Sequence, residues 1–245
     1  MTLLITNAGA LPLTQNLLHT CFKHGISNIL VVCLDAKAHR TLSRYPVTTF
    51  YFHGKPSLEK TTLFGANRFR RITFLKMLFV SLALERGYDI LFVDSDAVFL
   101  DDPYPHLDYD CDLNIQSGSH SLERNGQLYV NTGFFFARSN ASCISFFKRL
   151  LRYASLTRLY TDDQSYFNTL LKRRPALLSV QILDLKKFPN GKIFWEHQDQ
   201  LIQPAMIHNN FAIGLREKIS RFKVRGLWYL PEEQSKTAEC FDEIQ

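Results

Sequence analysis

The sequence predicts an α/β fold in which helices flank a mostly parallel central sheet. Short apolar runs typical of buried strands alternate with segments whose apolar residues recur every three to four positions, as on one face of a helix. Hydrophobic residues make up 46% of the chain and charged residues 21%, so a packed core is expected. No linker or repeat divides the sequence, and residues 1–245 are expected to form a single domain.

Strands and helices alternate through the first half of the chain. An apolar run at 2–6 predicts the first strand, and Gly25 is placed to end the helix that follows it. A continuous apolar run at 29–34 ends at Asp35 and predicts a buried strand, while Pro46 ends the next helix. The expected strands of this half are 2–6, 29–34 and 47–52, and the expected helices are 13–23 and 36–43.

The second half begins with the clearest helix, at 69–86. Its apolar residues recur at helical spacing between Ile72 and Leu82, and Gly87 is a typical residue to end it. A continuous apolar strand at 89–93 follows and runs directly into Asp94-Ser95-Asp96. The remaining strands are expected at 97–100, 112–116, 128–137, 177–183 and 205–208, and the remaining helices at 141–154, 163–173 and 215–222.

The pair Asp94 and Asp96 is the main candidate for chemistry. Open α/β sheets bind ligands beyond the carboxyl ends of their strands, which is where these two residues emerge. Two positions apart, they share one side of an extended chain, and their carboxylates repel each other unless a cation lies between them. Hard oxygen ligands suit Mg²⁺ or Mn²⁺. The alternative is that both carboxylates only cap a turn.

A nucleotide-sugar diphosphate would complete such a site. Its pyrophosphate is the leaving group, and a divalent ion neutralises the charge that develops there as the glycosidic bond breaks. The short side chain of Ser95 leaves room for the nucleotide. The net charge of +6 and the sequence pI near 9.1 also favour anionic ligands.

Charge and cysteine content exclude several other classes. No helix-turn-helix, zinc or RNA-recognition motif accompanies the basic charge, so nucleic acid is not an expected partner. The five cysteines are widely spaced and show no zinc-binding pattern. We expect no signal peptide, because the apolar stretch at residues 3–6 is too short and no basic residues precede it. We expect no transmembrane segment in this chain, because no run of 18 apolar residues occurs. Two localisations stay open, the cytoplasm and, for a catalytic domain separated from its anchor, the Golgi lumen.

The segment 87–103, with Asp94-Ser95-Asp96 after an apolar strand, resembles the D-x-D strand of GT-A nucleotide-diphospho-sugar transferases. The later motifs Asn131-Thr132-Gly133, Asp163-Gln164 and His208-Asn209-Asn210 resemble glycosyltransferase family 77, which includes plant cell-wall xylosyl- and arabinosyltransferases. This resemblance runs from about residue 6 to residue 228. It implies a single Rossmann-like GT-A domain, a UDP-sugar donor, a glycan or glycoprotein acceptor, Mn²⁺ (or Mg²⁺) as cofactor, and retention of anomeric configuration.

The same resemblance implies roles for individual residues. The metal ligands are Asp94, Asp96 and His208. The candidate nucleotide-binding residues are Thr6, Asn7, Asp35, Asp94, Ser95, Lys76 and Lys218, of which the first three meet the uridine. The candidate catalytic residues are Asp163, Gln164 and Asn131, and Thr132 and Gly133 line the sugar and acceptor side. The spacing from His208 to Gly214 and Lys218 departs from the related family 8 pattern, so Arg216 and Arg221 compete with Lys218 for the pyrophosphate.

Several of these residues have a purely structural alternative. His208 is also compatible with a hydrogen-bonded structural histidine, and Asp162 and Asp163 with the cap of the following helix. Lys76 could extend past its apolar neighbours to solvent. No residue stands out as a nucleophile, so a same-face transfer is favoured, with Asp163 as the fallback nucleophile. A non-catalytic nucleotide- or carbohydrate-binding protein on the same scaffold is the alternative function.

Overall fold

The computed structural model describes residues 1–53, 67–124, 128–157, 160–173 and 178–231. Its strands are β1 (Thr2–Thr6), β2 (Ile29–Cys33), β3 (Thr48–Tyr51), β4 (Ile90–Val93), β5 (Ala97–Phe99), β6 (Leu113–Ser117), β7 (Val130–Ala137), β8 (Val180–Leu183) and β9 (Met206–His208). Its α-helices are α1 (Leu11–Lys23), α2 (Ala36–Leu42), α3 (Asn67–Leu84), α4 (Ala141–Leu156), α5 (Asp163–Lys172), α6 (Gly191–Glu196) and α7 (Leu215–Val224). Short 3₁₀ helices occupy Ala8–Ala10, Tyr104–His106, Leu122–Arg124 and Gln198–Gln200.

Every strand and helix expected from the sequence is present, with ends that differ by a few residues. Helix α1 begins at Leu11, two residues earlier than expected. Pro12 is compatible with the first turn, because amides there make no intrahelical hydrogen bond and the lack of an amide hydrogen in proline costs nothing. Helix α6 was not predicted. Its six residues are too few to show a helical period, and the Asn190 side chain, which accepts from the Ile193 amide, caps it.

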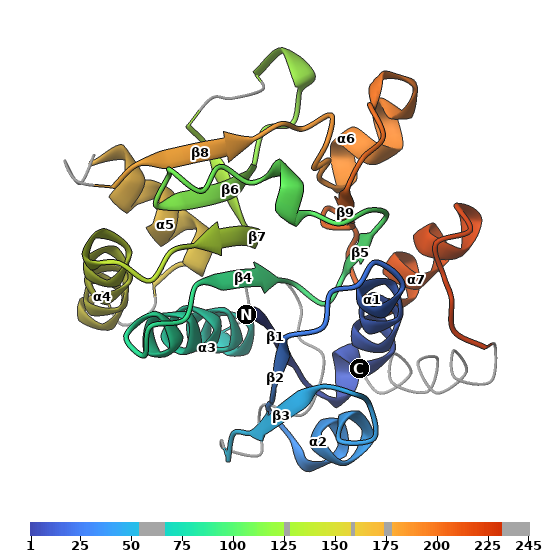
Figure 1. Cartoon of the computed structure of the whole chain (residues 1–245), viewed down its shortest axis with the longest axis horizontal. Coiled ribbons are helices and arrows are strands. Elements are labelled where there is room, and N and C mark those ends of the chain that lie inside the picture. Colours follow the sequence, from blue (N-terminus) through green and yellow to red (C-terminus); the bar gives the residue numbers. More distant parts are fainter. Residues whose placement is uncertain (54–66, 125–127, 158–159, 174–177, 232–245) are drawn as a thin grey trace.

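The strands form a seven-stranded sheet in the order β3-β2-β1-β4-β7-β6-β8 and a two-stranded sheet of β5 and β9 (Figure 1). Neighbours in the large sheet are parallel except where β7 lies antiparallel to both β4 and β6. The predicted α/β fold with a mostly parallel central sheet is therefore confirmed.

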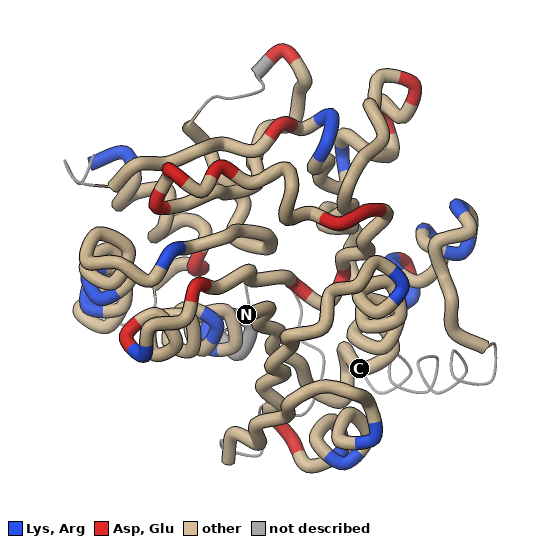
Figure 2. Tube along the Cα trace, in the orientation of Figure 1, with Lys and Arg blue, Asp and Glu red and all other residues tan. Residues whose placement is uncertain are grey.

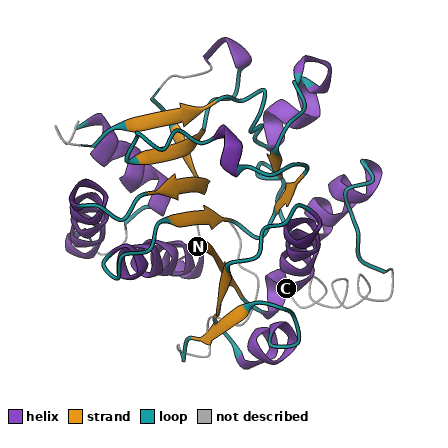
Figure 3. Ribbon diagram, viewed as in Figure 1, coloured by secondary structure: helices purple, strands orange, loops and turns teal. Residues whose placement is uncertain are grey.

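Helices cover both faces of the large sheet (Figure 3). Helices α3, α4 and α5 pack against one face, where Phe135 of β7 is buried, and α1 and α2 pack against the other, where Phe134 and Phe136 point. This alternation along β7 follows from the two-residue period of a strand. Burial on both faces also explains why the central strands appear as continuous apolar runs in the sequence.

A third apolar cluster holds the C-terminal part of the chain in place. Residues from α1, β5, α6, β9 and α7 form it, including Val98, Ile207 and Ile219. Helix α7 is thereby packed beside the small sheet, which places its polar face near the end of β4. Figure 2 shows Lys and Arg on several separate helices, α2, α4 and α7 among them. No described helix has both the length and the apolar character that crossing a membrane requires.

Candidate active site

The two aspartates stand at a tight turn where β4 leaves the large sheet. The Asp94 amide donates to the Gly133 carbonyl at 2.7 Å, so Asp94 is still paired with β7. The chain then turns, because the Ala97 amide donates back to the Asp94 carbonyl at 3.2 Å, and β5 begins. The chain is therefore not extended from Asp94 to Asp96, and the condition for a shared side through the strand period is not met. The turn, and not the strand period, brings the two carboxylates to one side.

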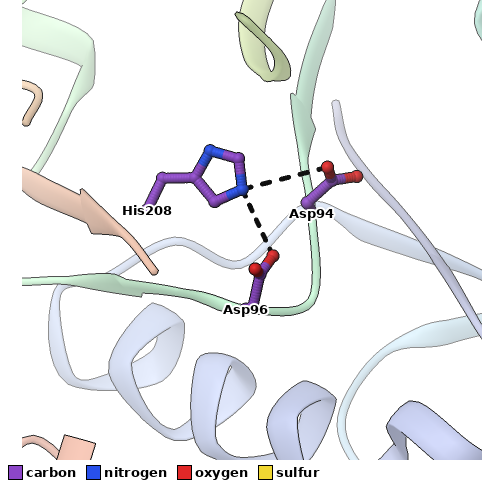
Figure 4. Close-up of side chains that lie close together, drawn as sticks. All are labelled: Asp94, Asp96 and His208. Carbon is purple, nitrogen blue, oxygen red and sulfur yellow. Dashed lines mark ion pairs between the residues drawn. The ribbon is translucent and has the colours of Figure 1, made fainter. Parts of the chain in front are cut away.

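His208 reaches this turn through the small sheet. Strands β5 and β9 pair antiparallel with Ala97 opposite His208, and the Asn209 amide donates to the Asp96 carbonyl at 2.8 Å. The His208 Nε2 atom lies 3.2 Å from Asp96 Oδ1 and 3.9 Å from Asp94 Oδ2 (Figure 4). The three candidate ligand atoms all lie within 4.8 Å of one another. Two carboxylates and one imidazole form a donor set that is compatible with a divalent metal ion.

Gly133 makes the close approach of His208 possible. A Cβ atom at this position would lie 2.0 Å from His208 Cε1 and 2.7 Å from Asp94 Oδ2. Any side chain here would thus occupy the space of the imidazole ring. The Asn131 side chain fixes the same segment, since its Oδ1 accepts from the Gly133 amide at 2.7 Å. Gly133 thus allows a close approach to the backbone, and the neighbouring group is His208.

Of the three basic residues that compete for the pyrophosphate, Lys218 is the one that reaches Asp96. Its Nζ lies 2.7 Å from Asp96 Oδ2, whereas Arg221 pairs with Glu217 on its own helix at 2.8 Å and Arg216 is exposed. Burial alone would raise the pKa of Asp96, but the positive charge of Lys218 outweighs it and holds that pKa well below its ordinary value. The Asp96 carboxylate is therefore kept ionised.

Lys76 is buried and does not extend to solvent, so the solvent-reaching alternative was wrong. Its Nζ lies 2.8 Å from Asp163 Oδ2 and 3.6 Å from Asp94 Oδ1, and it donates to the Thr132 carbonyl at 3.1 Å. Burial acts to lower the pKa of Lys76, but the negative charges of Asp163 and Asp94 outweigh it and raise that pKa. One buried cation thus connects the metal-ligand candidate Asp94 with the candidate catalytic residue Asp163.

Asp163 begins α5 but does not cap it. The capping residue is Asp162, whose Oδ1 accepts from the Ser165 amide at 2.8 Å. The Asp163 carboxylate instead points inward, where its Oδ2 accepts from the Thr132 hydroxyl at 2.7 Å as well as from Lys76. Gln164 follows on the partly exposed side of the helix, with its Nε2 3.5 Å from the Tyr129 hydroxyl.

The predicted uridine-binding residues lie at the carboxyl ends of β1 and β2, at the same edge of the sheet as Asp94. Each already has an internal partner. Asp35 accepts from the amides of Ala38 at 2.8 Å and Ala8 at 2.5 Å, and so caps α2 while holding the loop after β1. The Thr6 and Thr14 hydroxyls lie 2.6 Å apart, and Asn7 Oδ1 accepts from the Ala10 amide at 3.0 Å.

Ser95 and Gln116 complete the surroundings. The Ser95 hydroxyl donates to the Ile5 carbonyl at 3.4 Å, which links the aspartate turn to β1. Sequence reasoning missed Gln116, a fully buried residue of β6 whose Oε1 lies 2.9 Å from His208 Nδ1. The signal in the sequence was a polar amide, Gln116, in a short strand that was expected to be buried.

Several solved glycosyltransferases share this architecture. A galactosyltransferase, LgtC, crystallised with donor and acceptor sugar analogues, superposes with a TM-score of 0.61 at 14% identity, covering 96% of this chain and 99% of that chain. Mouse xyloside xylosyltransferase 1 superposes with a TM-score of 0.53 at 13% identity, covering 87% of this chain and 98% of that one. The fold is GT-A, as expected.

Sequence comparison identifies the family. The family model described as nucleotide-diphospho-sugar transferase matches residues 24–222, and the chain belongs to this family. Relatives include a UDP-galactose:fucoside alpha-3-galactosyltransferase of Dictyostelium discoideum, 28% identical over 94% of this chain and 43% of its own length. A UDP-D-xylose:L-fucose alpha-1,3-D-xylosyltransferase of Arabidopsis thaliana is 25% identical over 72% of this chain and 56% of its own length. The chain thus spans about half the length of these relatives.

Proposed function

We propose that this protein is a divalent-metal-dependent, retaining glycosyltransferase that moves a sugar from a UDP-sugar to a hydroxyl of a glycan or glycoprotein. The observation that carries the proposal is the convergence of Asp94, Asp96 and His208 on one point, with Lys218 beside them. Because this cluster lies beyond the carboxyl end of β4, it occupies the ligand-binding edge of an open α/β sheet.

Asp94, Asp96 and His208 would hold the Mn²⁺ or Mg²⁺ ion through two carboxylates and Nε2. The bound ion supplies charge neutralisation for a departing diphosphate. Lys218 is placed to add a second positive charge there, since its ammonium group already lies against Asp96. Asp94 is the most open of the three ligands, with 36% of its side chain exposed, which provides an entry side for the donor.

The sugar would lie between the metal cluster and the N-terminus of α5. In this proposal Asp163 and Gln164 bind donor hydroxyls, and Asn131, Thr132 and Gly133 line the sugar and acceptor side. Lys76 orients Asp163 through an ion pair at 2.8 Å in which both side chains are buried. Ser95 and the ends of β1 and β2 would receive the uridine. In this proposal Thr6 and Asn7 contact the uridine, and Asp35 contributes by fixing the loop at Ala8.

A same-face transfer fits these contacts better than a covalent intermediate on Asp163. The Oδ2 atom of Asp163 accepts from both Lys76 and the Thr132 hydroxyl, which reduces its nucleophilicity. In the same-face route the bond from the anomeric carbon to the phosphate oxygen breaks as the bond to the acceptor oxygen forms. The acceptor proton passes to the departing phosphate, and the configuration is retained.

The relatives guide the choice of substrates. Their names specify UDP-galactose or UDP-xylose as donor and a fucoside or L-fucose as acceptor. We therefore propose a hexosyl or pentosyl donor, to be tested first with UDP-galactose and UDP-xylose and with methyl fucoside as acceptor.

The test is UDP release from a panel of UDP-sugars, with Mn²⁺ and with EDTA, for the wild type and Asp96→Asn. Release is expected to need the metal and to be lost in the variant. Asp110→Asn, which removes an exposed carboxylate outside the cluster, serves as the matched control and should behave as the wild type. Undiminished release in EDTA and in Asp96→Asn would refute the metal role. Binding of UDP without turnover of any donor would instead favour the non-catalytic alternative.

A further inference from the structure

Gln116 lies at the end of β6 and is completely buried behind the His208 ring. Its Nε2 lies 3.0 Å from the Phe188 carbonyl oxygen and 3.1 Å from the Pro189 carbonyl oxygen. Its Oε1 lies 2.9 Å from His208 Nδ1. The amide therefore connects the loop before α6 with the imidazole ring.

These contacts fix the direction of each hydrogen bond. A carbonyl oxygen only accepts, so the end of the Gln116 amide that faces Phe188 and Pro189 must be the NH₂ group. The other end is then the carbonyl oxygen, which also only accepts, and His208 Nδ1 must donate to it. A neutral imidazole carries one ring proton, so the proton on Nδ1 leaves a lone pair on Nε2.

The lone pair on Nε2 points at the aspartates. Asp96 Oδ1 lies 3.2 Å away and Asp94 Oδ2 3.9 Å away, so three electron-rich atoms face one another. The ring is fixed on its other sides as well. The Pro189 carbonyl accepts from the His208 backbone amide at 3.2 Å, and the Cα of Gly133 lies against Cε1. A cation at the point where the three atoms converge would relieve the repulsion between them.

We propose that Gln116 is a positioning residue that selects the Nδ1-protonated form of His208 and thereby directs the Nε2 lone pair at the metal. The inference rests on the metal site of the proposed function, although Gln116 itself touches neither the metal nor the substrate. Replacement of a residue that orients a metal-bound histidine in this way commonly lowers metal affinity by about 10- to 100-fold.

Three variants separate positioning from folding. Gln116→Leu keeps the approximate volume but removes the acceptor for Nδ1–H. Gln116→Glu keeps an acceptor for Nδ1–H but cannot donate to the two carbonyl oxygens, so it should cost stability and preserve the ring orientation. Asn114→Leu is the matched control, because Asn114 is an equally buried amide of β6 that bonds only to the backbone of Asp108 in the described contacts.

The first measurement is Mn²⁺ affinity of the donor-free protein, from the electron paramagnetic resonance signal of free Mn²⁺. We expect the Kd to rise about 10- to 100-fold in Gln116→Leu and less than about threefold in Gln116→Glu and Asn114→Leu. An unchanged Kd in Gln116→Leu, or an equal loss in Asn114→Leu, would overturn the proposal.

The second measurement is a long-range ¹H–¹⁵N correlation spectrum of the metal-free wild type, with the His208 signals assigned from their absence in His208→Asn. The proton is expected on Nδ1. A proton on Nε2 alone would overturn the proposal even if no variant folds. If the wild type binds no Mn²⁺ but carries its proton on Nδ1 alone, the proposed metal function fails while the positioning by Gln116 is upheld.

Discussion

Replacement of Gly133 by alanine should remove His208 from the metal site. The added Cβ would lie 2.0 Å from His208 Cε1, whereas ordinary contact begins at 3.4 Å, so the ring must withdraw by about 1.4 Å. Metal–ligand distances tolerate changes of only about 0.2 Å. A displacement several times larger breaks the bond from Nε2, and we expect the Mn²⁺ Kd to rise about 100-fold or more. Overpacking should cost about 1–3 kcal/mol of unfolding free energy.

The assay combines Mn²⁺ titration with urea unfolding, so that loss of metal is distinguished from loss of fold. Gly25→Ala is the control, because Gly25 has a φ of +75° and no atom lies within 4 Å of the position that an added Cβ would take. That variant should lose about 1 kcal/mol through backbone strain and keep its metal affinity. Wild-type Mn²⁺ affinity in folded Gly133→Ala would refute the placement of the His208 ring against this glycine.

Three further predictions concern the charged groups of the site. The variant Lys218→Met removes the cation that lies 2.7 Å from Asp96 and competes with the metal. Mn²⁺ should then bind the donor-free protein roughly 3- to 10-fold more tightly, while the KM for the UDP-sugar rises. Weaker Mn²⁺ binding would contradict this. The depressed pKa of Asp96 means that its carboxylate stabilises the fold above the unfolded value of 3.8 and that this contribution is lost as the pH falls below it. Urea unfolding of metal-free Asp96→Asn should therefore depend less on pH below about 4 than the wild type, and an equal dependence would count against the pairing. Lys76→Met leaves the buried Asp163 without its cation and should lower the unfolding free energy by about 3–5 kcal/mol; a loss under about 1 kcal/mol would argue against the buried pair.

The sequence predicted the elements well because each depends on local patterns. The apolar run at 29–34 became β2, and the helical spacing after Ile72 became α3. The apolar pattern of each element is local, so the presence of the element can be predicted without knowledge of its distant contacts. Helix α6 escaped because a six-residue segment is too short to show a period.

The site was predictable in composition but not in geometry. The ligand candidates Asp94, Asp96 and His208 were named from motifs, yet only the β5–β9 pairing brings them together. Lys218 and Asp96 are 122 positions apart in the chain, and Gln116 and His208 are 92 apart. Such contacts leave no local pattern, because the third apolar cluster and the sheet register determine them.

The inward direction of Lys76 also depends on residues that are distant in the sequence. Its apolar neighbours on α3 are compatible with a lysine that extends to solvent and with one that is buried. Lys76 is buried because Asp163 and Asp94, from other elements, pair with its ammonium group and compensate the cost of burying its charge.

The most direct test of the metal site is anomalous diffraction from crystals of the wild type soaked with Mn²⁺ and UDP, with data collected on both sides of the manganese absorption edge. We expect a strong anomalous peak within about 2.0–2.6 Å of oxygens of Asp94 and Asp96 and of Nε2 of His208, next to the UDP diphosphate. A structure in which UDP is bound and no manganese peak lies between these three side chains would contradict the account.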